Sequence, residues 1–277
     1  MKARIKFQKY GYMKFIGHLD VLRYFQKAFR RAGYDSEYTQ GFNPHQIISF
    51  AAPLGVGLTS DAEYVDIGLR TCDTSETMVK KINEVLSEGF YVTGFHLLTE
   101  DSGNGKMASA MSLVASADYL VSLKDGCSLG NGILSCEEFR ELFEKFYSKQ
   151  DIIINKKTKK SEKMVNIKPM ISFVAFDEKE YDAYLGCHLA DLPKPVNNEK
   201  SYYLNAASKA DAYENNIKVY MQLDTGSASN LKPELVMEAF CSDSDLEYNP
   251  YAWQVHRLEI YTRDDETKRL IPLDSVW

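Results

Sequence analysis

Strand and helix patterns alternate in a fixed order over the first hundred residues, and this order limits the folds open to the chain. Residues 3–7, 46–51, 63–69 and 90–98 have the alternation or the β-branched and aromatic character of strands. Two helices, 19–32 and 75–86, are predicted by apolar residues spaced three and four apart, and Gly33 ends the first. The order β-α-β-β-α-β predicts a ferredoxin-like domain, an antiparallel sheet with two helices on one face.

The rest of the chain repeats this order with additions. The polar, glycine-containing segment 100–106 is the expected boundary, so we predict domains over residues 1–100 and 110–277. Further strands are expected at 117–123, 152–154, 164–176, 181–189, 217–223 and 253–261, and further helices at 136–146 and 232–240. The insertion 190–216 is expected to be a surface loop with one helical turn near 208–211. The predicted fold class is α+β, with two ferredoxin-like halves, the second elaborated by a basic hairpin and this insertion.

Length and composition restrict the classes of protein further. A chain of 277 residues exceeds the usual size of one domain, which favours two. The apolar runs are shorter than a membrane-spanning helix, and a strand pattern, not a signal sequence, follows Met1, so we expect a cytoplasmic protein that does not bind membranes. The five cysteines form no C-x-x-C pair, so neither a disulfide framework nor a metal site is predicted.

Positive charge is concentrated in two places although the net charge is −6. On the first helix, Arg23, Lys27, Arg30 and Arg31 lie away from the apolar face. Between two predicted strands, segment 155–163 carries one glutamate and five lysines: Lys156, Lys157, Lys159, Lys160 and Lys163. Such groups bind the phosphates of a polyanion, or they are simply solvated surface.

Residues 40–45 predict a shaped loop ahead of the strand at 46–51. Gly41 can adopt a positive φ angle, and Asn43 followed by proline favours a turn. We expect Gln40, Asn43 and His45 to make polar contacts to a base or ribose, and Phe42 and Tyr12 to stack on unpaired bases. Core packing is the alternative role of the two aromatic residues.

Two histidines are candidates for catalysis. His18 precedes the first helix, two residues from Asp20, and His45 belongs to the loop at 40–45. A histidine pair can act as general acid and base in metal-independent RNA cleavage, or the histidines can hold a metal with Asp20. The alternative is structural, with His18 fixing its loop through Asp20.

Several segments resemble the uncharacterised, radical-SAM-associated family known as DUF2344. The resemblance is specific in FIGHLD (15–20), FRRAG (29–33), QGFNPH (40–45) and ISFAAPLGVG (48–57). It continues in the basic segment 160–169 and, more weakly, in WQVHR (253–257). The resemblance implies a partner, a radical SAM enzyme with a cobalamin-binding-like region.

The chain has no C-x3-C-x2-C motif and so is expected to carry no cluster or other cofactor of its own. We therefore predict a non-catalytic RNA-binding module, for tRNA or rRNA, that presents its substrate to the separate radical SAM enzyme. The expected cleft is framed by the 41–45 loop, the first helix and the lysine hairpin. The alternatives are an RNA-processing endonuclease that uses His18 and His45, and a scaffold that contacts only the partner enzyme.

Overall fold

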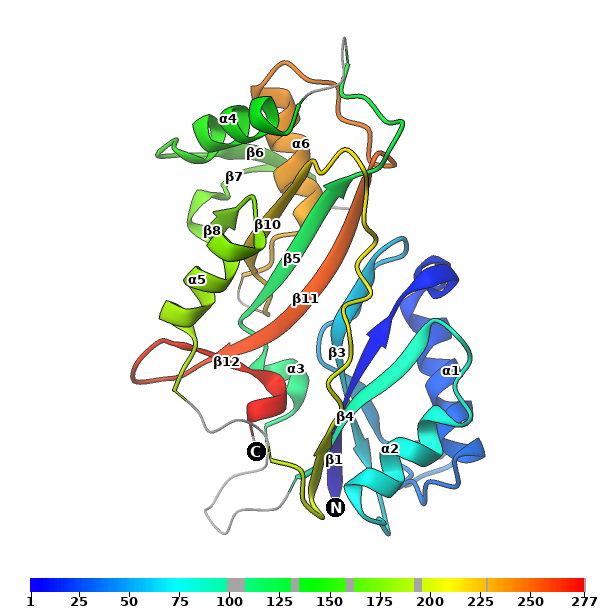
Figure 1. Ribbon diagram of the computed structural model, residues 1–277. Coiled ribbons are helices and arrows are strands. Elements are labelled where there is room, and N and C mark those ends of the chain that lie inside the picture. Colours follow the sequence, from blue (N-terminus) through cyan, green and yellow to red (C-terminus); the bar gives the residue numbers. More distant parts are fainter. Residues whose placement is uncertain (99–107, 131–134, 158–161, 192–195, 228, 277) are drawn as a thin grey trace. The chain divides into compact units, whose positions relative to one another are not determined.

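The computed structural model describes residues 1–98, 108–130, 135–157, 162–191, 196–227 and 229–276. Its contacts divide the chain into two compact units (Figure 1). Unit 1 comprises Met1–Ala115, His188–Ala210 and Arg257–Trp277, and unit 2 comprises Ser116–Cys187 and Asp211–His256. The units are therefore interleaved along the sequence. The segment 100–106, expected as the boundary, lies outside the described residues.

Unit 1 is built on antiparallel strands. Its elements are β1 (Lys2–Lys9), η1 (Gly11–Phe15), α1 (His18–Arg31), β2 (Ile48–Phe50), β3 (Thr59–Gly68), α2 (Ser75–Asn83), β4 (Phe90–Leu98), α3 (Ala110–Leu113), β9 (Ser201–Tyr203), β12 (Leu270–Pro272) and η3 (Leu273–Ser275). The strand order is β9-β4-β1-β3, and β2 also pairs with β3. Strand β11 (Trp253–Arg263), next to β3, begins in unit 2 and ends in unit 1.

One face of β1 packs against the helices of unit 1. Its alternate residues Ala3, Ile5 and Phe7 are buried, as the strand period of two requires. Phe7 contacts Phe25 of α1, with ring centroids 4.6 Å apart, and Val79 and Ile82 of α2 belong to the same core. This apolar core explains why both amphipathic helices form where their periodicity predicts them.

The intervening residues of β1 lie in a buried polar layer on the other face. Lys6 Nζ donates to Glu259 Oε2 at 2.6 Å and to Asp274 Oδ2 at 2.7 Å. Burial alone lowers the pKa of the Lys6 ammonium, but the two carboxylates outweigh it and raise the pKa above its ordinary value. Arg4 forms a second buried pair with Asp66 at 2.9 Å. The C-terminal segment of unit 1 thus supplies the carboxylates of Glu259 and Asp274, which neutralise the Lys6 ammonium of β1.

His96 of β4 makes the stability of the polar layer depend on pH. Burial, then the charges of Arg4 and Lys200, lower the pKa of His96 from 6.5 to about 4. Because the unfolded chain binds the proton more tightly, the neutral ring stabilises the fold above pH ~6.5, and this contribution is lost as the pH falls towards ~4.

Between pH 7.5 and 4.5 we expect the unaltered protein to lose about 1–3 kcal/mol more of its free energy of unfolding than the His96→Gln variant loses. The effect is not larger because the ring is only partly buried and solvent screens its charge. Urea unfolding at both pH values measures the difference. Equal pH dependence of the two proteins would contradict this role.

Unit 2 has the elements β5 (Ser116–Leu123), α4 (Cys136–Tyr147), β6 (Ile153–Lys157), β7 (Glu162–Asn166), η2 (Lys168–Met170), β8 (Ile171–Ala175), α5 (Glu178–His188), β10 (Lys218–Asp224) and α6 (Pro233–Asp243). Its strand order is β8-β10-β5-β11, and β6 pairs only with β7. The Ser135 capping box starts α4 as the sequence predicts. Phe139, Phe143 and Phe146 of α4 pack against Phe240 of α6 in the core.

The predicted strand at 181–189 is wrong, because this segment belongs to helix α5. Glu180 N donates to Asp177 Oδ1 at 2.9 Å, and Phe176 N donates to Glu180 Oε2 at 3.0 Å. The Asp177 side chain thus caps the first turn, and Glu180 bonds the backbone of the residue before this cap, which favours a helix start. Tyr181 and Tyr184, three residues apart on the helix, stack on Tyr220 and Phe173.

Two further expectations are corrected. The single strand predicted over 164–176 is interrupted by η2, which contains Pro169, a residue without the N–H that a strand ladder uses. The insertion 190–216 contains strand β9, and its residues 208–211 are irregular instead of helical. Ser208 and Lys209 bond the Asp61 carboxylate there, which fixes the backbone without a helical turn.

The predicted α+β class is confirmed. Six α-helices accompany mostly antiparallel strands in the described residues. Every helix in that part of the chain falls short of the length and apolar character that crossing a bilayer requires.

Candidate nucleic-acid interface

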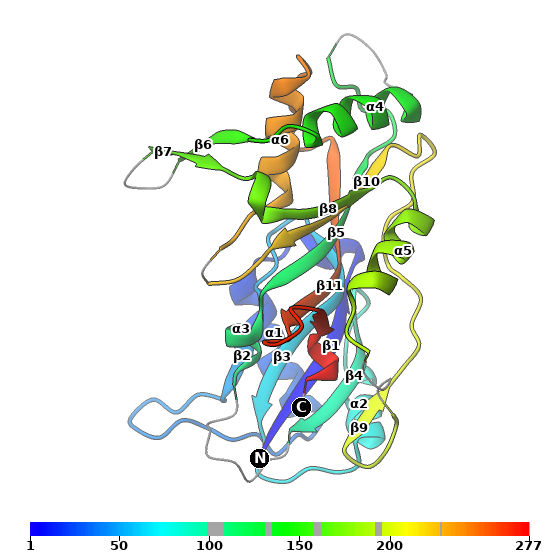
Figure 2. The same cartoon turned by 90° about the vertical axis from the view of Figure 1, so that its left-hand side faces the viewer.

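The β6–β7 hairpin brings two lysines face to face. Lys156 and Lys163 are directly opposite in its antiparallel register. Like charges at such positions repel each other, because their Cβ atoms are only about 5 Å apart. Lys156 Nζ donates to Asn230 O at 3.2 Å, while Lys163 is exposed. The hairpin forms an arm that extends from the sheet of unit 2 (Figure 2).

The other lysines of the basic segment are only partly described. Lys157 lies opposite Glu162 in the hairpin register. Lys159 and Lys160 lie outside the described residues. The basic character of the described hairpin therefore resides in the Lys156–Lys163 pair.

All four basic residues of helix α1 are exposed, and they differ in their contacts. Arg23, Lys27 and Arg30 recur at four- and three-residue spacing and are exposed, as the helical period predicts. Arg23 forms a 3.3 Å ion pair with the exposed Asp20. Arg31 instead donates to Val85 O and lies 6.0 Å from the Tyr24 ring. Arg31 is thus engaged within unit 1, and the other three form the outward basic face.

The loop predicted at 40–45 is exposed along its whole length. Thr39 N donates to His45 O at 2.9 Å, and His45 N donates to Thr39 Oγ1 at 3.1 Å. Gly41 has φ +117°, a conformation that a side chain disfavours. Phe42 stands fully exposed at the tip, and Gln40 and Asn43 flank it in the exposed loop. An apolar ring held out in this way can meet a base or a protein partner.

The two predicted stacking residues do not meet. Tyr12 is 91% exposed in η1, which follows the Lys9 end of β1. The Phe42 loop begins beside Gly68, which pairs with Lys2 at the opposite end of β1. Eight extended residues span roughly 25 Å, so the two rings belong to different ends of unit 1.

The structure also separates the two candidate catalytic histidines. The His18 ring contacts Phe50 edge-on with centroids 5.2 Å apart, and burial lowers the pKa of His18. His45 lies five residues before Phe50 along an extended segment, a span of roughly 16 Å. Asp20 pairs with Arg23, as described above. The arrangement therefore does not place both imidazoles at one reacting atom.

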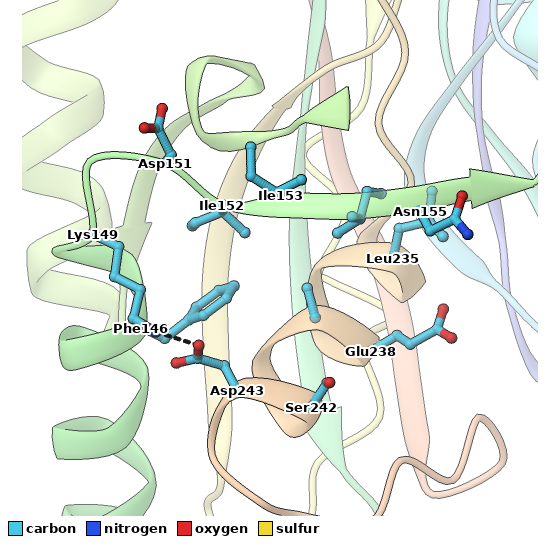
Figure 3. Close-up of a pocket in the computed structure, with 12 residues that line it drawn as sticks. Phe146, Lys149, Asp151, Ile152, Ile153, Asn155, Leu235, Glu238, Ser242 and Asp243 are labelled. Atoms are coloured by element: carbon cyan, nitrogen blue, oxygen red, sulfur yellow. Dashed lines mark hydrogen bonds and ion pairs between the residues drawn. The ribbon is translucent and has the colours of Figure 1, made fainter. Parts of the chain in front are cut away.

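Unit 2 contains a pocket of about 510 Å³ between α4, β6 and α6 (Figure 3). Its apolar lining comprises Phe146, Ile152, Ile153, Ile154, Leu235 and Ala239. Its polar lining comprises Lys149, Asp151, Asn155, Glu238, Ser242 and Asp243. This combination of apolar walls and a few polar groups is typical of small-molecule sites.

The polar groups of the pocket differ in their availability. Lys149 and Asp243 form an ion pair along one side, and Asn155 and Glu238 lie on the other (Figure 3). Asn155 Nδ2 donates to Glu162 at 3.1 Å. Within the described residues, the exposed Glu238 carboxylate has neither a hydrogen bond nor an ion pair. The pocket is therefore rich in acceptors.

Sequence reasoning did not identify this pocket or an exposed apolar cluster in unit 1. The cluster comprises Tyr12, Phe15, Leu19 and Val56, which are 59–91% exposed. Leu19 falls outside the buried stripe of α1 and Phe15 precedes the helix, and such exposed apolar residues are a signal in the sequence. The pocket gave no such signal, because its apolar residues follow ordinary core patterns on three elements.

A comparison with protein-family models identifies the family of this chain. A search of curated proteins finds no match. Residues 2–233 match the family model described as an uncharacterised protein conserved in bacteria, DUF2344. The match covers most of the chain, and the protein therefore belongs to the DUF2344 family.

Proposed function

We propose that the protein is a non-catalytic RNA-binding module that presents tRNA or rRNA to a separate radical SAM enzyme. The observation that carries the RNA proposal is the Lys156–Lys163 pair. An isolated two-stranded hairpin gains little from packing, and a like-charge pair destabilises it further unless an anion lies between the charges. A phosphate of an RNA backbone supplies that anion.

The basic face of α1 supports the same ligand. Arg23, Lys27 and Arg30 point outward along one side of the helix and can follow a phosphodiester chain. Exposed Phe42 and Tyr12 add surfaces on which unpaired bases stack, at separate ends of unit 1. Contacts with Gln40, Asn43 and His45 accompany the Phe42 site in this proposal.

The proposal includes the two ferredoxin-like halves. The order β4-β1-β3-β2 in unit 1 and the order β11-β5-β10-β8 in unit 2 support it, because both follow the 4-1-3-2 arrangement of that fold. Many proteins of this fold bind other ligands, so the fold alone does not specify RNA.

The radical SAM partner rests on the family resemblance. The five cysteines of the chain do not have the C-x3-C-x2-C spacing, so the partner would supply the cluster. In this arrangement the protein contributes RNA binding and positioning, and the partner contributes the chemistry.

Neutralising the hairpin pair tests the RNA proposal. We expect Lys156→Gln/Lys163→Gln to weaken binding of labelled tRNA and rRNA fragments about tenfold at low salt. The slope of the logarithm of the RNA association constant against the logarithm of the salt concentration is negative. It should become less steep by about 1–2, because two phosphate contacts are lost. Fluorescence anisotropy over a salt series measures both quantities.

Lys145→Gln/Lys179→Gln is the matched control, since it removes two exposed charges from α4 and α5 and leaves the hairpin intact. This control should retain most of the affinity. Equal losses in both double variants would show that only net charge matters. If the unaltered protein binds neither RNA at low salt, the RNA function is rejected.

A further inference from the structure

We infer that the pocket of unit 2 holds a guanine base unstacked from the RNA, while the Lys156–Lys163 pair binds the adjoining phosphate. The inference rests on the proposed RNA function and adds a base preference to it. It assigns one ligand to two neighbouring features of β6: its apolar start lines the pocket, and its basic end bears the lysine pair.

The geometry of β6 joins the two features. Ile154 lines the pocket, and Lys156, two residues further, projects from the same face of the strand. Two strand residues span about 7 Å, a distance that one nucleotide can bridge between base and phosphate. Lys163 is opposite Lys156, so both ammonium groups are on this face.

The shape and lining of the pocket suit a flat ring. Its volume of about 510 Å³ accommodates a nucleoside, and Phe146, Ile152 and Leu235 provide apolar surfaces in Figure 3. Single-stranded RNA is usually recognised through bases that leave the stack, rest on apolar or aromatic side chains and bond through their Watson–Crick edges.

The free polar groups select among the bases. The Glu238 carboxylate is an acceptor on one side of the pocket, whereas the Lys149 ammonium opposite is already paired with Asp243. Guanine presents the N1–H and the N2 amino group together, the most donor-rich Watson–Crick edge of the four bases. A carboxylate can accept both bonds at once, which uracil, with a single N–H, cannot reproduce.

Three oligonucleotides test the assignment with the full chain. They are a labelled twelve-nucleotide oligouridylate, the same RNA with one central guanosine, and the same RNA with inosine at that position. Inosine keeps N1–H and lacks the 2-amino group. We expect the guanosine RNA to bind at least about tenfold more tightly than the oligouridylate, and inosine to lose most of this preference.

Glu238→Gln should abolish the guanosine preference, measured as the ratio of its affinities for the guanosine RNA and the oligouridylate. Glu141→Gln, the same charge change at an exposed position of α4 outside the pocket lining, should keep the preference. A guanosine preference that survives in Glu238→Gln would overturn the assignment to this pocket.

The two proposals fail in different ways. Equal affinity of the unaltered protein for all three oligonucleotides would overturn the guanine inference and leave RNA binding intact. Failure to bind any of them at low salt, together with failure to bind tRNA and rRNA fragments, would reject both.

Discussion

Lys6→Ala is expected to lower the free energy of unfolding by about 3 kcal/mol, because it leaves two largely buried carboxylates without their shared cation. Glu259 and Asp274 each bond the Lys6 ammonium, and Tyr64 Oη also donates to Glu259 at 2.6 Å. Urea unfolding measures the loss. Lys2→Ala, at an exposed position of the same strand, is the control and should change stability by less than about 0.5 kcal/mol.

The loss in Lys6→Ala should also depend on pH. Burial raises the pKa of Glu259, and Lys6 partly opposes this rise. Without Lys6 the pKa rises further, so protonation stabilises the folded variant at low pH and this contribution disappears as the pH increases. The deficit should therefore be smaller at pH 5 than at pH 8. A loss no larger than that of Lys2→Ala would contradict the role of the cluster.

The second large effect is expected in unit 2, where Phe240→Ala should cost about 3–5 kcal/mol. Phe240 is fully buried, and its ring centroid lies 4.8 Å from Phe143, 5.4 Å from Phe139 and 5.8 Å from Phe146. Alanine leaves a cavity beside these rings, which all belong to α4 and cannot readily close it. Unfolding followed by tryptophan fluorescence reports the change, since Trp253 contacts Phe139.

Phe240→Leu should cost less than Phe240→Ala, because the smaller volume change leaves a smaller cavity. Tyr251→Ala is the exposed control and should stay within about 0.5 kcal/mol. Equal losses for Phe240→Leu and Phe240→Ala would show that cavity size does not set the cost. Phe146 also lines the pocket, so Phe240→Ala is expected to weaken guanosine binding as well.

Local signals predicted most individual elements. The spacing of Phe25 and Phe29 predicted α1, and the Ser135 capping box predicted α4, because these signals act within one or two helical turns. Helix α5 was mistaken for a strand although Asp177 is a good N-cap residue for it. The tyrosines of α5 stack on aromatic residues of strands β8 and β10. Their spacing in the sequence is therefore set by these tertiary contacts and does not show the apolar stripe of a buried helix.

The candidate site was predictable only in part. The exposed loop around Phe42 and the outward charges of α1 follow from turn chemistry and helix period. The pairing of Lys156 with Lys163 required the hairpin register, and the pocket required the packing of three elements. The separation of Tyr12 from Phe42 also required the sheet.

The amino-acid sequence by itself determined most of the order of strands and helices, the α+β class and the exposed basic and loop residues, because these depend on neighbours a few positions apart. Only the tertiary structure decided how the segments interleave into two units and which charges meet in the polar layer. Lys6 finds its carboxylate partners 253 and 268 residues along the chain. No local periodicity encodes such a pair, which forms because a buried ammonium must be neutralised wherever the fold brings a carboxylate within reach.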